Sequence, residues 1–264
     1  MRFKKKFCLL AFFILSLSAF SQDFYWDEPV TVSSGESRFP RAVNAGNRSY
    51  AFWQEIDSAS KKIYLSVMKI NPDGKFSVNP RFAGPFSYSG EIPDIYSVAV
   101  TSSGRVAVVA LSSDSRISTF VSDDNCSSFN RYDFPSQKAQ FLAPKIFATK
   151  NGNFMLFCSL AKQENLGNAS ILTHNFYIYS AYSSNGLNWS DFKQTFSGEK
   201  YKNSFSPVLA SASDGNYLVF QTKVQNHGSV TYQLYEAFAE TDTSFWSEPV
   251  LISGENGKKS QKMY

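Results

Sequence analysis

Few residues of this chain combine a reactive side chain with the spacing that chemistry requires. The two histidines, His174 and His227, do not have the spacing of metal ligands, and the segment 71–74 (NPDG) lacks the repeated acidic ligands of a calcium loop. No nucleophile elbow, phosphate loop or dinucleotide fingerprint occurs. We therefore predict no metal and no cofactor. The sequence leaves open whether Cys126 and Cys158 form a disulfide. The apolar run FMLFCSL predicts that Cys158 is buried in a strand.

The N-terminal segment predicts export from the cell. Arg2 and three lysines precede the apolar run 7–17, and Ala19 and Ser21 have the small side chains found at a cleavage site. We expect residues 1–21 to be a signal peptide, which places the mature protein in the periplasm or outside the cell. The signal carries four basic residues and no acidic one, so the formal charge falls from +4 to zero on cleavage. The mature chain therefore has no electrostatic preference for nucleic acid or anionic membranes, and no transmembrane segment is expected after cleavage.

A repeat organises the remainder of the chain, which must position any site. The tripeptide Ser-Gly-Glu occurs four times, with its glycines at Gly35, Gly90, Gly198 and Gly254. These spacings fit a period of about 55 residues, with one copy of the tripeptide lost near 135–140. Four repeats of one structural unit are predicted.

Each repeat has the pattern of four antiparallel strands. A proline opens the first strand, at Pro40, Pro93, Pro144 and Pro207, and a glycine turn follows, at Gly46, Gly104, Gly152 and Gly215. Second strands are predicted at 49–54, 106–111, 154–160 and 217–222, and third strands at 62–68, 116–122, 175–183 and 230–238. A shorter fourth strand closes each unit. The prediction is an all-β protein, a β-propeller with four blades at about 37–88, 91–136, 139–197 and 200–253. A β-sandwich is the alternative, but a sandwich does not require the same signals at one period.

The turn after the third strand of the third repeat carries the most specific motif, with Ser183, Asn185, Gly186 and Trp189. It resembles the Asp box, or BNR repeat, of the sialidase superfamily. In such a turn the Asn side chain accepts backbone N–H groups, the glycine takes a positive φ, and the aromatic ring packs beneath the blade. The other repeats keep parts of the box, namely Ser122, Asp124 and Phe129 in the second, Asp242 and Trp246 in the fourth, and Asp73, Gly74 and Phe76 in the first.

The resemblance covers residues 22–255 and raises a question of ring closure. Residues 246–253 (WSEPVLIS) match residues 26–33 (WDEPVTVS), so both ends of the propeller carry a fourth-type strand, and the one at 26–32 has no blade to complete. The chain is either a four-bladed ring with a redundant strand or an incomplete ring of six blades, as in sialidases. We favour the incomplete ring, with residues 256–264 as a tail.

The resemblance also implies a test for an active site. Sialidases bind a substrate carboxylate with three arginines from different blades, and they use a Tyr nucleophile activated by Glu together with an acid/base Asp. The motif around the first arginine matches Arg38 in SRFP, while Glu55 and Asp57 are acid/base candidates by proximity. No arginine follows Arg131, and we assign no catalytic residue.

These observations favour a protein that binds a glycan or an extracytoplasmic protein without catalysis. The first alternative is an exo-sialidase-like glycoside hydrolase, supported by the motif at Arg38. The second is a truncated remnant of a larger propeller protein. The sequence leaves the oligomeric state open.

Overall fold

The computed structural model describes residues 31–33, 35–71, 73–135, 140–166, 169–226 and 229–253. The chain divides into two compact units, 1–32 and 33–264, and the strands all lie in the second. The predicted signal peptide, the tail 256–264 and residues 26–30 of the predicted N-terminal strand lie outside the described residues, and residues 31 and 32 belong to no strand.

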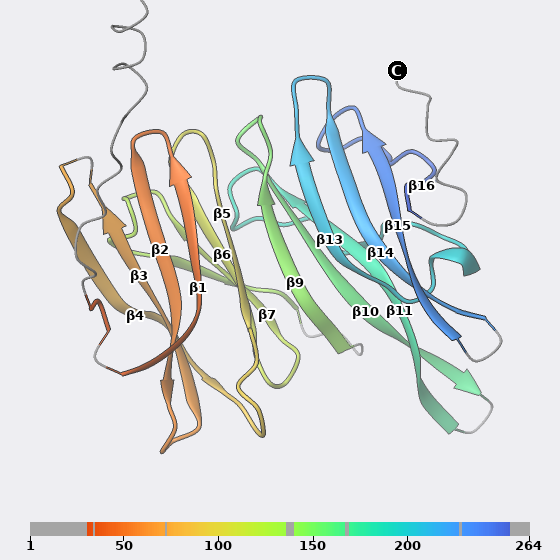
Figure 1. The fold of residues 1–264 in the computed structure, drawn as a ribbon, viewed down its shortest axis with the longest axis horizontal. Coiled ribbons are helices and arrows are strands. Elements are labelled where there is room, and N and C mark those ends of the chain that lie inside the picture. Colours follow the sequence, from red (N-terminus) through yellow and green to blue (C-terminus); the bar gives the residue numbers. More distant parts are fainter. Residues whose placement is uncertain are drawn as a thin grey trace, which may run out of the picture. The chain divides into compact units, whose positions relative to one another are not determined.

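Four antiparallel sheets of four strands each follow one another along the chain (Figure 1). The first sheet contains β1 (Glu36–Ala45), β2 (Arg48–Asp57), β3 (Lys62–Ile70) and β4 (Phe76–Ser87). The second contains β5 (Tyr96–Val100), β6 (Val106–Leu111), β7 (Ile117–Ser122) and β8 (Asn130–Asp133). The third contains β9 (Gln140–Ala148), β10 (Phe154–Leu166), β11 (Ala169–Ser183) and β12 (Lys193–Gln194). After a short 3-10 turn, η1 (Glu199–Tyr201), the fourth contains β13 (Ser204–Ser211), β14 (Asn216–Asn226), β15 (Ser229–Ala239) and β16 (Val250–Leu251).

This architecture confirms the predicted all-β fold with four-stranded antiparallel blades. The fourth strands differ from the prediction, because they are not uniformly short. β4 has 12 residues and pairs along the whole of β3 with two interruptions of register, whereas β12 and β16 have two residues each. The strand expected at 246–253 contains only residues 250–251, since β16 pairs solely with Tyr235 and Glu236 of β15.

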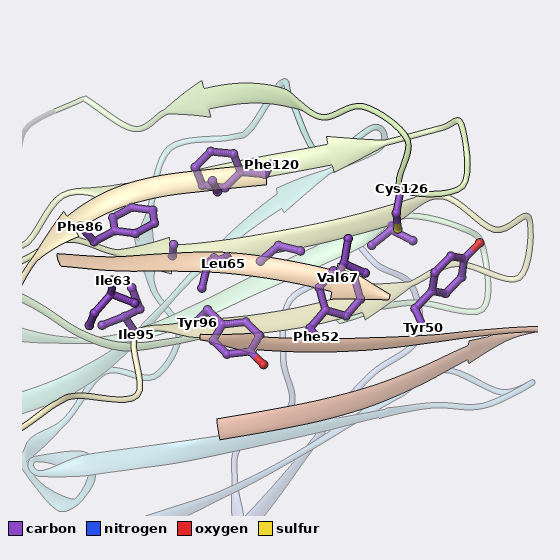
Figure 2. Packing of buried hydrophobic residues seen from close by; sticks show 14 of the residues in the cluster. Tyr50, Phe52, Ile63, Leu65, Val67, Phe86, Ile95, Tyr96, Phe120 and Cys126 are labelled. Carbon is purple, nitrogen blue, oxygen red and sulfur yellow. The ribbon is translucent and has the colours of Figure 1, made fainter. Parts of the chain in front are cut away.

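Apolar side chains between consecutive sheets form three hydrophobic clusters. In the first, Phe52 of β2 and Phe120 of β7 both pack edge to face against Phe82 of β4, while Tyr50 lies beside Cys126 (Figure 2). β6 reads VAVVAL and is buried on both faces, because it lies in a sheet with neighbours on either side. β2 instead places alternate residues against the second sheet, in the order typical of a strand with one buried face. A fully buried Phe or Leu side chain stabilises such a core by about 1.5–3 kcal/mol.

A buried glutamine joins the first two sheets. The side chain of Gln54 is fully buried, donates from Nε2 to the carbonyl oxygen of Pro93 (3.0 Å), and accepts at Oε1 from the backbone N–H of Ile95 (2.9 Å). Both partners lie just before β5. One side chain of the first sheet therefore satisfies two main-chain groups at the start of the second sheet, which fixes the position of the two sheets along the strand direction.

The first strands of the sheets contact one another in chain order, β1 with β5, β5 with β9, and β9 with β13. No contact of similar extent joins β13 to β1 within the described residues. Cys126 and Cys158 are both buried and both free, and the predicted burial of Cys158 in a strand is confirmed. Among the described residues, no helix is long and apolar enough to cross a membrane.

Candidate functional site

Three of the four first strands share a backbone irregularity at the repeat proline. The residue before the proline has a positive φ at Phe39 (54°), Ala143 (47°) and Ser206 (53°). The register of pairing shifts at the same places, as expected of β-bulges. Bulges and left-handed non-glycine residues concentrate at functional sites, where they redirect side chains. We call this end of the sheets the bulge end, and the opposite end, which carries the turns 122–129, 183–189 and 241–246, the box end.

A groove of about 750 Å³ lies at the bulge end between the third and fourth sheets. Its described lining is rich in aromatic rings and amides, with Leu142, Ala143, Ser159, Asn175, Phe176, Asn203, Phe205, Ser206, Lys223, Gln225 and Tyr232. Phe205 and Tyr232 meet edge to face at 5.9 Å, and Tyr232 is 60% exposed. Lys223 carries the one charge of this lining. Rings with an open face and adaptable amides suit a polyhydroxylated ligand, because they supply stacking and hydrogen bonds together.

A row of charged residues lies on the first strands or just before them, each residue directly after a repeat proline. Arg41 of β1 pairs with Asp94, which precedes β5, and its guanidinium lies 4.9 Å from the centre of the Tyr96 ring. Lys145 of β9 occupies the third position of the row. Burial, followed by the charge of Arg41, lowers the pKa of Lys145. Burial also raises the pKa of Tyr96, whose hydroxyl donates to the carbonyl oxygen of Phe39 (2.6 Å).

Arg38 lies at the bulge end in a local ion pair. Its guanidinium contacts the Glu36 carboxylate at 2.8 Å, and the side chain is 49% exposed. The hydroxyl of Ser58 also donates to Glu36 (2.9 Å), and the bonds from Ser58 and Arg38 lower the pKa of Glu36. Arg38 is therefore accessible, and it is held by a carboxylate two residues away rather than by groups from another sheet.

The structure does not bring Glu55 and Asp57 together with Arg38. Glu55 pairs with Ser37 and not with Arg38, so it lies on the opposite face of the first sheet, where it accepts from Arg81 Nε (3.0 Å). Asp57 accepts the backbone N–H groups of residues 59 and 60, both at 3.2 Å, which makes it a turn-forming side chain of the β2–β3 connection.

The turn 183–189 at the box end is organised around Asn185. Its Oδ1 accepts the backbone N–H groups of Leu187 (2.9 Å) and Asn188 (2.8 Å), and the Ser183 hydroxyl accepts that of Gly186 (2.8 Å). Gly186 has φ +78°, and a Cβ there would lie 2.7 Å from Val121 Cγ2. Glycine is therefore required twice, by the backbone conformation and by the close approach of the second sheet.

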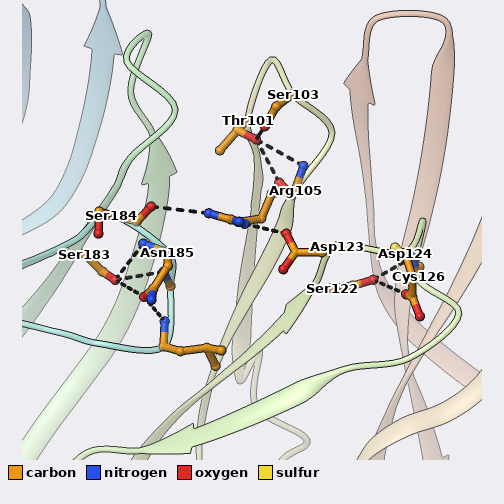
Figure 3. Close-up of polar contacts among 12 residues, drawn as sticks. Thr101, Ser103, Arg105, Ser122, Asp123, Asp124, Cys126, Ser183, Ser184 and Asn185 are labelled. Carbon is orange, nitrogen blue, oxygen red and sulfur yellow. Dashed lines mark hydrogen bonds and ion pairs between the residues drawn. The ribbon is translucent and has the colours of Figure 1, made fainter.

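The turn 122–129 repeats this arrangement with Asp124, whose Oδ1 accepts from Ser127 N (3.1 Å) and Ser128 N (2.9 Å). These bonds, with that from the Ser128 hydroxyl, lower the pKa of Asp124 to about 2. Cys126 stands in the glycine position with a φ of 64°, and burial raises the pKa of its thiol to about 12. Arg105 spans the two turns by contacting Asp123 and the carbonyl oxygen of Ser184 (Figure 3).

Asp242 departs from the other two turns, because its carboxylate binds side chains of other segments. Oδ2 accepts from the Thr149 hydroxyl (2.7 Å) and from the Asn153 amide (2.6 Å), while Oδ1 accepts from the Asn216 amide (2.9 Å). Burial raises its pKa, but the combined hydrogen bonds leave it lowered. Trp246 packs against the third sheet, with its ring 6.1 Å from that of Phe157. Asp242 thus joins the third and fourth sheets.

Sequence reasoning missed the charged row and the groove. The row had a readable signal, because Arg41, Asp94 and Lys145 each follow the proline that marks the repeat. The groove had none, since its residues come from six separate segments of two repeats. No group of metal-ligating side chains occurs among the described residues. Every carboxyl group there with a shifted pKa has it lowered, namely Glu36, Asp57, Asp114, Asp124, Asp133, Asp214, Asp242 and Glu248.

No protein-family model and no curated protein matches the sequence. Solved structures do. The Penicillium chrysogenum alpha-L-arabinanase complexed with arabinobiose has a TM-score of 0.56 at 13% identity, covering 84% of this chain and 68% of that one. The alpha-L-arabinofuranosidase Arb93A from Fusarium graminearum, complexed with an iminosugar inhibitor, has a TM-score of 0.57 at 11% identity, covering 87% and 70%. At these identities the similarity concerns the fold alone. The chain has the β-propeller fold found in glycoside hydrolases.

Proposed function

We propose that this protein is an exported Asp-box propeller, related to sialidases in its fold, that binds a glycan without hydrolysing it. The groove between the third and fourth sheets is the proposed binding site. Its open aromatic faces at Tyr232 and Phe205 are the observation that carries the proposal. A sugar ring stacks on such a face through its C–H groups, while neighbouring amides bind its hydroxyls.

The chemistry of the groove supports binding in preference to hydrolysis. Glycoside hydrolysis uses two carboxyl groups in most enzymes, and one of them has a raised pKa so that it can protonate the leaving group. The described lining of the groove offers amides, hydroxyls and an ammonium instead of such carboxyl groups. The solved structures with this fold include an arabinanase bound to arabinobiose, which makes short neutral oligosaccharides the first ligands to test.

The test is calorimetric titration of the mature chain with arabinobiose, xylobiose, cellobiose and sialyllactose. We expect at least one of them to bind, and Tyr232→Ala to weaken that binding at least tenfold, because it removes the most exposed ring of the groove. Phe245→Ala is the matched control, since Phe245 is a fully exposed aromatic residue at the box end. If none of the four binds, or if both variants bind like the parent, the groove is not the site.

The alternative is an exo-sialidase-like hydrolase, which the motif at Arg38 favours. The guanidinium of Arg38 is accessible, but it contacts the Glu36 carboxylate at 2.8 Å. It could bind a substrate carboxylate only after leaving Glu36. A fluorogenic sialoside assays this alternative directly. Turnover of the sialoside that Arg38→Ala abolishes would replace the binding proposal with the enzymatic one.

A further inference from the structure

The charged row at the repeat prolines contains two cations, on β1 and β9, and one anion just before β5. β1 contacts β5 and β5 contacts β9, so the three first strands that contain or follow these residues lie beside one another in chain order (Figure 1). Arg41 and Asp94 neutralise each other, with side chains 28% and 34% exposed. Lys145 leaves the row with a net charge of +1. This arrangement is separate from the aromatic groove, because neither Arg41 nor Lys145 lines it.

Both cations have unused hydrogen-bonding capacity. Arg41 contacts Asp94 through Nη2, whereas its Nε is buried and has no hydrogen-bond partner. Lys145 is partly buried and forms no ion pair with any described residue. A partly desolvated ammonium beside a guanidinium is unfavourable unless an anion compensates it. Among the described residues, Asp94 is the carboxylate whose charge acts on Lys145, and it is already engaged by Arg41.

We propose that Arg41 and Lys145 form a binding site for a monoanionic group, the carboxylate or sulfate ester of a ligand. Lysine supplies a compact point charge, and the guanidinium of Arg41, whose side chain is 28% exposed, supplies directed N–H donors. Asp94 restricts the charge of the ligand. A monoanion brings the row to zero, whereas a dianionic phosphate would leave it negative and would be repelled by Asp94 in a partly desolvated place.

The experiment titrates the mature chain with glucuronate, glucose 6-sulfate, glucose 6-phosphate and glucose. The four probes share one ring and differ in the charged group, and the first two distinguish a carboxylate source from a sulfate source. We expect one or both monoanions to bind at least tenfold more tightly than glucose and than glucose 6-phosphate at pH 8. Lys145→Met should weaken monoanion binding at least tenfold, and Lys145→Arg should retain it.

Lys193→Met is the matched control, because it removes an exposed lysine on β12 at a distance from the row. It should bind like the parent. A cooperative melt of Lys145→Met without ligand shows that this variant folds. A monoanion should then raise the melting temperature of Lys145→Arg but not that of Lys145→Met. Tyr232→Ala should leave the difference in affinity between the monoanions and glucose unchanged, so failure of the groove and failure of this site are distinguishable. The proposal would be overturned if glucuronate and glucose 6-sulfate bound no more tightly than glucose. It would also be overturned if Lys145→Met bound a monoanion as tightly as the parent protein does.

Discussion

The indole N–H of Trp189 donates to the carbonyl oxygen of Gly186 at 2.8 Å, and the same carbonyl accepts from the buried Thr119 hydroxyl of the second sheet (2.9 Å). The turn 183–189 is thus both closed on itself and fastened to the neighbouring sheet. A Cβ at Gly186 would lie 2.7 Å from Val121 Cγ2, so the turn or the Val121 side chain would have to shift.

We therefore expect Gly186→Ala to lower the free energy of unfolding by about 2–4 kcal/mol, from strain at positive φ combined with overpacking. Urea unfolding followed by tryptophan fluorescence measures it. Gly152→Ala is the control, since Gly152 also has a positive φ (79°) but nothing lies within 4 Å of its added Cβ. It should cost about 1 kcal/mol. Equal losses for both variants would mean that Val121 moves aside at no cost.

The hydrogen bonds of Gln54 to the start of the second sheet predict a loss of stability when they are removed. Gln54→Met keeps the volume but leaves the Pro93 carbonyl and the Ile95 N–H without a partner in a buried place. We expect a loss of about 1–3 kcal/mol in the free energy of unfolding.

Gln221 provides the comparison for Gln54. It pairs with the residue two positions before Pro207, just as Gln54 pairs with the residue two before Pro40. The described residues place no further sheet against its face. Gln221→Met should therefore change stability by less than about 0.5 kcal/mol. A loss there as large as at Gln54 would show that a partner covers the fourth sheet in solution.

Much of this fold could be predicted from the sequence, because its determinants are local. Alternation of apolar residues and the glycine turns place the second strands, and β6 coincides with the predicted 106–111. The remainder depends on contacts between sheets. The partners of Asp242 lie about ninety positions earlier, at Thr149 and Asn153, and nothing in the fourth repeat indicates them. The length of β4 depends on two register shifts against β3, which leave no local signal.

Asp124 predicts a pH dependence of stability. Its pKa is lowered to about 2 in the folded protein by bonds from Ser128, against about 3.9 when unfolded. A depressed folded pKa contributes stability that is fully present above pH 4 and is lost as the pH falls through 2. Asp124→Asn removes the titration, and so the pH dependence of this contribution, but keeps an oxygen for the backbone N–H groups, as Asn185 does in the third repeat. We expect near-parental stability at pH 7 and a smaller loss between pH 4 and pH 2, measured by urea unfolding. An identical acid profile would exclude Asp124 as a source of that loss.

The same substitution at Asp242 should have the opposite outcome at neutral pH. Its carboxylate receives donors at both oxygens, from Thr149 and Asn153 at Oδ2 and from Asn216 at Oδ1. An amide nitrogen in place of either oxygen would direct N–H groups at other donors in a buried place, and one donor would lose its acceptor. We expect Asp242→Asn to lower the free energy of unfolding by about 1–3 kcal/mol at pH 7. Asp124→Asn is its matched control, because both variants replace the carboxylate of a box-end turn by its isosteric amide. If the two variants are equally stable at pH 7, the hydrogen bonds to Asp242 do not contribute to holding the third and fourth sheets together.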